Sequence, residues 1–153
     1  MHFRLCAIIV KAISHTFFVL AFSKRTLYCL LFLFDVMKAC VQYFSQTGNT
    51  RKFAEAISDS LKIPAVFDLV TSEPSVVDDF DGIILGIPVH GSNPSKEALS
   101  FVERLPEGNG KRTILFCTCR LWKGSTFKKL EKELKKKSYT TILKISKKGR
   151  EFT

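Results

Sequence analysis

The stretch from Phe44 to Thr50 (Phe-Ser-Gln-Thr-Gly-Asn-Thr) most constrains the fold of this chain, because it joins two segments of opposite pattern. Residues 38–43 before it are apolar and β-prone, whereas residues 51–61 after it carry apolar side chains at helical spacing. Between this strand and this helix stand hydroxyl and amide side chains, one glycine and no charge. The first backbone N–H groups of a helix lack intrahelical partners and favour an anion. The loop therefore predicts a phosphate-binding site.

The same alternation of strand, polar loop and helix continues along the chain. Further strands are expected at 65–70, 83–87, 113–117 and 140–145, with Pro88 closing the third strand, and helices at 50–61, 95–105 and 125–137. Alternating elements of this kind build right-handed βαβ units, in which a parallel sheet carries helices on both faces. Ligands bind such sheets beyond the carboxyl ends of the strands, where the strand order reverses. The polar loops 44–50, 89–94 and 118–124 are therefore expected along one edge.

Length and composition indicate one globular domain. The 153 residues are enough for a single core, and 46% hydrophobic with 25% charged residues excludes wholesale disorder. The five cysteines are scattered and odd in number, which argues for a reducing, cytoplasmic setting without a disulfide framework. Their spacing predicts no metal site.

The net charge of +10 is unevenly distributed along the chain. Residues 111–153 carry fourteen basic and three acidic side chains, whereas residues 37–110 carry six and ten. Because the basic excess lies at the C-terminal end, away from the polar loop, we expect no nucleic-acid partner. The lysine-rich helix 125–137 is most simply a solvated face.

Residues 1–36 differ from the rest, and we divide the chain into this apolar segment and a domain from 37 to 153. The best membrane window, Leu5 to Phe22, is 18 residues long and contains Lys11 and His15, whereas a spanning helix needs about 20 nearly uncharged residues. Three interpretations stay open. Met37 is the biological start, or the segment is a membrane anchor, or it is an apolar helix packed on the domain.

The order of these motifs resembles the flavodoxin family. Ser45-Gln46-Thr47-Gly48-Asn49-Thr50 is similar to the (Ser/Thr)-x-Thr-Gly-Asn-Thr phosphate loop of flavodoxins, and residues 81–89 (Asp-Gly-Ile-Ile-Leu-Gly-Ile-Pro-Val) resemble their third strand and second flavin loop. The resemblance covers about residues 37–148. It implies a three-layer α/β fold with a five-stranded parallel sheet in the order 2-1-3-4-5. It also implies FMN bound non-covalently at the switch point between strands 1 and 3, where the strand order reverses.

The resemblance carries site residues with it. The FMN phosphate is expected on hydroxyls and backbone amides of Ser45, Gln46, Thr47, Gly48, Asn49 and Thr50. The flavin ring is expected along Pro88, Val89, His90 and Gly91, with the Gly91 carbonyl able to turn towards flavin N5. The third loop supplies Thr118, Cys119, Arg120, Leu121 and Trp122. Trp122 either stacks on the flavin or packs on the surface, and His90 either contacts the ring or faces solvent.

Two departures from the family generate expectations of their own. Arg120, Lys123 and the basic C-terminal third predict a flavin whose second reduction occurs at a higher potential than in acidic flavodoxins. The helix that flavodoxins add after the last strand is also missing, because residues 149–153 are too few to form it. We expect residues 13–34 to cover that sheet face as a helix; a longer gene product or a partner protein are the alternatives.

The function implied by the resemblance is FMN-dependent electron transfer between a reductase and an acceptor protein. No catalytic acid, base or nucleophile is required for it, and none is evident. Two alternatives stay open: a flavodoxin-like NAD(P)H:quinone reductase, and a basic binding module that uses the same fold without flavin. The expected location is cytoplasmic, with membrane contact if residues 1–36 form an anchor.

Overall fold

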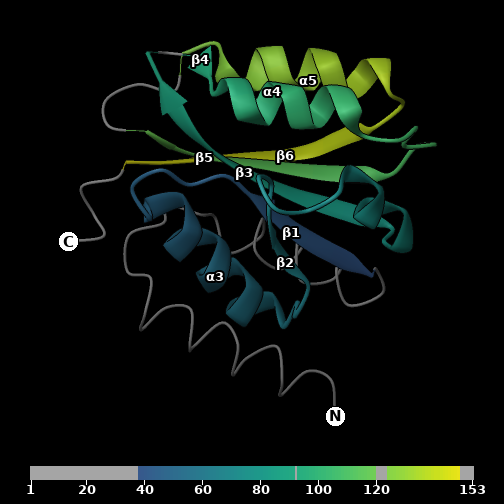
Figure 1. Ribbon diagram of the computed structural model, residues 1–153, viewed down its shortest axis with the longest axis horizontal. Helices are drawn as coiled ribbons and strands as arrows, with labels where there is room; N and C mark the ends of the chain where they lie inside the picture. The colour runs from purple at the N-terminus through teal and green to yellow at the C-terminus, as the bar shows by residue number, and fades with distance from the viewer. Residues whose placement is uncertain (1–37, 92, 120–123, 149–153) are drawn as a thin grey trace.

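The computed structural model describes residues 38–91, 93–119 and 124–148 of the chain. These residues form three layers, a central sheet with helices on both faces (Figure 1). In Figure 1, α4 and α5 lie above the sheet and α3 lies below it. The predicted α/β class is therefore confirmed.

The sheet has the strand order β2-β1-β3-β5-β6, and the neighbours along this path are parallel. The strands are β1 (Ala39–Tyr43), β2 (Val66–Asp68), β3 (Gly82–His90), β4 (Asn93–Pro94), β5 (Arg112–Cys119) and β6 (Thr140–Lys148). The two-residue β4 lies off the path and pairs antiparallel with the end of β3. Without β4, the observed order is the predicted 2-1-3-4-5.

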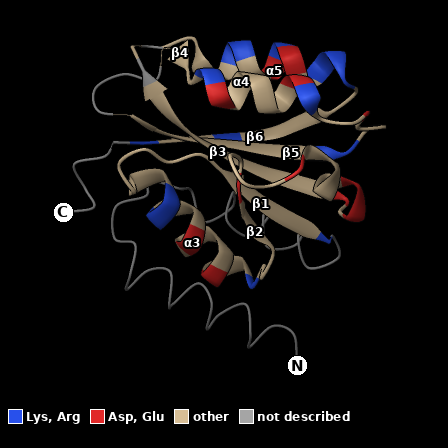
Figure 2. Cartoon of the chain, viewed as in Figure 1, with Lys and Arg blue, Asp and Glu red and all other residues tan. Residues whose placement is uncertain are grey.

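The helices follow the strands as the periodicity predicts. They are α3 (Asn49–Leu61), the 3₁₀ helix η1 (Pro74–Asp79), α4 (Lys96–Arg104) and α5 (Thr126–Lys136). Ser95 caps α4, because its Oγ accepts a hydrogen bond from the Ala98 N–H at 3.2 Å. Ser125 precedes α5, but its side chain makes no capping bond. Figure 2 shows the basic residues along α5, of which Lys128, Lys129, Lys132, Lys135 and Lys136 are exposed.

The prediction that Pro88 closes the third strand is wrong, because β3 continues to His90. In the structure β3 stays parallel to β5 as far as the pair Pro88–Thr118, and then turns to pair Val89 with Pro94 of β4. A proline lacks a backbone N–H donor, but its carbonyl can still accept a hydrogen bond and its fixed φ allows an extended backbone. Proline is therefore tolerated near a strand end. Thr118 and Cys119 pair with Lys147 and Lys148 of β6, so they belong to β5 rather than to a loop.

Two apolar cores lie on the two faces of the sheet. On the α4–α5 face, Ile83, Leu85 and Leu115 of the strands pack with Phe101 and Leu130. The core on the α3 face contains Val41, Ile84, Phe53, Ala54 and Phe116, together with neighbouring residues. Because both faces are buried, the strands read as continuous apolar runs.

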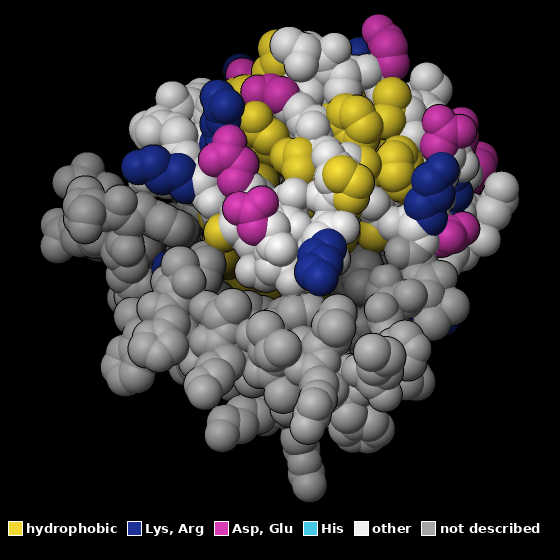
Figure 3. Space-filling view, turned by 90° about the horizontal axis from the view of Figure 1, so that it is seen from below, with side chains coloured by type: hydrophobic (Ala, Val, Ile, Leu, Met, Phe, Trp, Pro, Cys, Tyr) yellow, Lys and Arg dark blue, Asp and Glu magenta, His cyan; other side chains and the backbone are white. Residues whose placement is uncertain are grey.

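The helices in the described part of the chain cover the α3 face less completely than the other. Of the helices that the structure describes, only α3 lies on it, against β1, β2, β3 and β5, while Leu143 and Ile145 of β6 are half-buried there. Seen from this side, hydrophobic side chains reach the surface between charged ones (Figure 3). The predicted cover by residues 13–34 lies outside the described residues and stays a prediction, as does the division at 36/37. No helix in the described ranges is long and apolar enough to cross a membrane.

The tightest approach in the core is that of the Phe116 ring to the backbone of Gly86. A Cβ at position 86 would lie 1.8 Å from Cζ of Phe116. The same ring meets the Phe53 ring of α3 edge-on, with centroids 5.1 Å apart. Gly86 is therefore required by space, because any side chain there displaces the ring on which α3 packs.

We predict that Gly86→Ala lowers the free energy of unfolding by about 2–3 kcal/mol, because the added methyl overpacks a closed core. Urea unfolding followed by circular dichroism measures the loss. Phe116→Leu, which replaces the ring by a smaller side chain, is the companion variant. The double variant should lose clearly less than the sum of the two single losses, since the clash is then relieved. Additive losses would show that the clash does not limit stability.

Candidate functional site

The polar loop after β1 is held at both ends by backbone bonds. The Phe44 N–H donates to the Gly86 carbonyl at 2.9 Å, and the Lys52 N–H donates to the Gly48 carbonyl at 3.0 Å. Gly48 is the N-cap of α3 and has φ +85°. A Cβ there would meet nothing within 4 Å, so glycine is needed for the left-handed backbone rather than for space.

This loop presents unsatisfied hydrogen-bonding groups at its centre. No side chain caps the first turn of α3, and no acidic residue lies in it. The Ser45 Oγ is buried and has no hydrogen-bond partner. A buried hydroxyl without a partner costs about 1–3 kcal/mol, which a bound group can recover. An uncharged cradle of hydroxyl and backbone donors at a helix N-terminus fits a phosphate.

Thr50 ties the first loop to the third segment. Its Oγ1 lies 2.7 Å from the Oγ1 of Thr118, and both side chains are buried. The two residues are 68 positions apart in the chain. Both were predicted at the site, but the bond between them joins segments whose contact no local pattern specifies.

The second segment is the end of β3 and the turn after it. Pro88 is buried, Val89 is half-buried, and Gly91 is exposed with φ +53°. The Asn93 Nδ2 donates to the Gly91 carbonyl at 3.2 Å, and the Asn93 Oδ1 accepts from Lys129 Nζ of α5 at 2.5 Å. Asn93 therefore holds the carbonyl that was expected to turn towards the ring. Sequence reasoning missed this role, although the Gly-Ser-Asn-Pro turn was its local signal.

The third segment is described only in part. Thr118 and Cys119 are buried at the end of β5. The predictions for Arg120, Leu121 and Trp122 fall outside the described residues, as does the His90 side chain. Those assignments stay predictions.

The register of the sheet brings the three segments to one edge. Tyr43 of β1 pairs with Gly86 of β3, and Pro88 of β3 pairs with Thr118 of β5. β2 lies on one side of β1, and β3, the next strand of the main path, lies on the other, so the strand order reverses beside the 44–50 loop. This is where open α/β sheets bind ligands.

Charges near the loop lie at its periphery. Arg51 is exposed, and its Nε pairs with Glu55 Oε1 at 2.8 Å. The pKa of Tyr43 is raised, first by burial and then by the charge of Asp68. Burial raises the pKa of the Cys40 thiol to about 11, so this cysteine is not a nucleophile at neutral pH. Within the described ranges, no group of three or more His, Cys, Asp or Glu residues is arranged to hold a metal.

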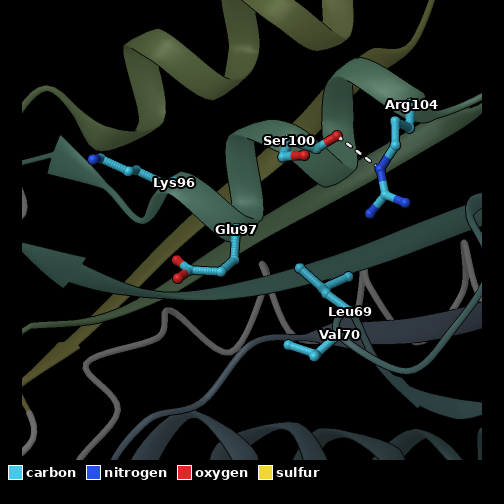
Figure 4. Close-up of a pocket in the computed structure, with 6 residues that line it drawn as sticks. All are labelled: Leu69, Val70, Lys96, Glu97, Ser100 and Arg104. Carbon is cyan, nitrogen blue, oxygen red and sulfur yellow. Dashed lines mark hydrogen bonds between the residues drawn. The ribbon is translucent and has the colours of Figure 1, made fainter.

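A separate hollow of about 350 Å³ lies between α4 and the segment after β2 (Figure 4). Leu69, Val70, Lys96, Glu97, Ser100 and Arg104 line it. The Arg104 Nε donates to the Ser100 carbonyl at 3.4 Å. None of the residues predicted to bind a cofactor lines this hollow, so it is not the predicted site.

Comparisons with known proteins agree with this arrangement. A family described as flavodoxin domain matches residues 40–147. No curated protein matches the chain significantly.

Solved structures share the fold. The two-electron reduced flavodoxin of Megasphaera elsdenii has 25% identity and a TM-score of 0.62, with 71% of this chain and 85% of that one covered. A flavodoxin from the domain Archaea has 23% identity and a TM-score of 0.60, with 72% and 83% covered. A flavoprotein of Lactobacillus acidophilus, solved in complex with FMN, has 13% identity and a TM-score of 0.56, with 72% and 93% covered. With the family match over most of its length, this chain belongs to the flavodoxin domain family.

Proposed function

We propose that this chain binds FMN non-covalently and transfers electrons between a reductase and an acceptor protein. The observation that carries the proposal is the 44–50 loop, in which the Ser45 Oγ is buried without a hydrogen-bond partner and the first turn of α3 that follows has no side-chain cap. Family membership suggests flavin-binding electron transfer, and the FMN complex of the Lactobacillus acidophilus neighbour supports this choice of flavin.

The residues of this chain bind and orient the cofactor. The hydroxyls of Ser45, Thr47 and Thr50 and the backbone N–H groups of the first α3 turn would hold the phosphate. The end of β3, from Pro88 to Gly91, would lie along the ring. When bound, FMN supplies the one- and two-electron chemistry. No side-chain acid, base or nucleophile is needed for such a transfer.

We predict that the purified protein takes up one FMN, and that Gly48→Ala weakens this binding at least tenfold. Alanine at φ +85° costs about 1–2 kcal/mol in backbone strain, which distorts the loop. Gly110→Ala is the matched control, since Gly110 has φ +83° and a Cβ there also meets nothing within 4 Å. Both variants should lose similar stability in urea, but only Gly48→Ala should lose FMN affinity, measured by quenching of flavin fluorescence.

The outcomes separate this proposal from its alternatives. A colourless protein that also fails to take up added FMN would contradict it. Binding of nucleic acid or anionic vesicles by that colourless protein would favour the basic binding module. Turnover of NAD(P)H with a quinone by the FMN-loaded protein would favour the reductase.

We also predict that the second electron enters at a higher potential than in an acidic flavodoxin titrated in parallel. The fourteen basic residues between 111 and 153 make the domain a less negative environment for a reduced, anionic flavin. A spectroscopic redox titration at low and high salt measures the effect. An equally low second potential in both proteins would contradict it.

A further inference from the structure

Helix α5 has the largest basic excess among the helices that the structure describes. The helices α3 and α4 each carry two basic and two acidic side chains, whereas α5 carries five lysines and two glutamates. These lysines appear in blue along α5, at the top of the view in Figure 2. Unlike the charges of α3 and α4, those of α5 therefore do not cancel.

Both glutamates of α5 already have basic partners. Glu131 pairs with Lys144 of β6, with 3.1 Å between Oε2 and Nζ. Glu133 pairs with Lys136, three residues further along the same helix, at 2.8 Å. The acids of α5 therefore form ion pairs with these two residues rather than with the other lysines of the helix.

Three of those other lysines form one exposed row, which we call the lysine row: Lys128, Lys132 and Lys135. Their spacing of four and three residues places them on one face of the helix. In the described part of the chain, none of the three side chains forms an ion pair or a hydrogen bond. Like charges at this spacing repel each other and destabilise a helix. A partner that brings negative charge would relieve this repulsion.

The lysine row begins beside the proposed cofactor site. Lys129, in the first turn of α5, donates from Nζ to the Asn93 Oδ1 at 2.5 Å, and the Asn93 Nδ2 donates to the Gly91 carbonyl at 3.2 Å. The start of α5 is thus in contact with the turn that is expected along the flavin ring. Because Lys128 is the neighbour of Lys129, a partner on the lysine row would lie close to that turn.

The surface of α5 favours an acidic protein over a lipid surface or a nucleic acid. The apolar residues Phe127, Leu130 and Leu134 of α5 are all buried, so the helix has no apolar face to insert into lipid. Phe127 is also its only aromatic residue, so no ring of α5 is available for stacking on a base. Carboxylates of a protein need neither feature to pair with lysines.

We propose that the lysine row is the docking surface for an acidic redox partner, a protein that carries carboxylates beside its own electron-transfer centre. This inference rests on the proposed function, because it names the kind of protein with which the flavin exchanges electrons. Opposite charges steer the encounter and raise the association rate at low salt. Weak electron-transfer encounters use small interfaces, and a single helix face is enough for one.

The kinetic test uses two electron acceptors of opposite charge, the acidic copper protein plastocyanin and the basic haem protein cytochrome c. The flavin of the FMN-loaded protein is first reduced with an equivalent of dithionite, without oxygen. It then gives one electron to each copper(II), which becomes copper(I), or to each haem iron(III), which becomes iron(II). Stopped-flow absorbance gives the second-order rate constants at several salt concentrations.

Docking is also measured without electron transfer. An isotope-labelled sample of the FMN-loaded protein is titrated with plastocyanin while both proteins are oxidised, and NMR chemical shifts report which backbone amides are affected. Anionic phospholipid vesicles are titrated in the same way, as the probe for a membrane.

Two triple variants are compared, and each loses three exposed positive charges. The row variant combines Lys128→Gln, Lys132→Gln and Lys135→Gln. The control variant changes residues near the starts of β1, β2 and β5, at the opposite edge of the sheet from the proposed site: Lys38→Gln, Lys62→Gln and Arg104→Gln. Circular dichroism and urea unfolding check the fold, and the single variant Lys132→Gln replaces the row variant if the latter is unfolded.

The row variant should lower the rate constant with plastocyanin about tenfold at low salt, and the difference should vanish at high salt. The control variant should stay within about twofold of the unchanged protein. Electron transfer to cytochrome c should not be slowed by the row variant. In the NMR titration, plastocyanin should shift the amides of the lysine row.

Other results would overturn the inference. Equal losses in the two triple variants would show that only net charge matters, and shifts confined to other elements would place the docking surface elsewhere. Binding of vesicles through the lysine row, without binding of plastocyanin, would identify a membrane surface instead. These outcomes leave the proposed function standing, whereas failure of the unchanged protein to bind FMN would overturn both.

Discussion

The ring of Phe116 lies on the bare backbone of Gly86 and meets the ring of Phe53 edge-on, with centroids 5.1 Å apart. This contact joins β3, β5 and α3 at one point of the core. A side chain at position 86 would push the ring away and move α3 with it. The beginning of α3 is thus positioned by packing one turn further into the helix.

The candidate site is a continuation of that packing. Two residues beyond Phe116, Thr118 bonds Thr50, which lies one turn before Phe53 on α3. The backbone bond from Phe44 to Gly86 holds the other end of the loop on the same strand. The loop therefore needs no charged side chain to keep its shape, and its hydroxyls and N–H groups stay available for a ligand.

The position of charge matters more here than its total. Most of the basic residues of α5 are exposed, where salt screens a charge beyond about 8–10 Å. Lys147 of β6 is instead buried.

The order of elements, the class of the fold and the placing of the loops were predictable, because apolar periodicity and turn residues are local properties of the sequence. The loop motif also placed Gly48 at the site, but its left-handed backbone is a finding of the structure. Strand ends were less predictable: Pro88 and Thr118 continue their strands because each is the other's partner in the sheet. The Thr50–Thr118 bond, the Asn93 contact with the Gly91 carbonyl and the burial of Lys147 were decided only by the tertiary structure. Each depends on register and packing between segments far apart in the chain, which no local pattern specifies.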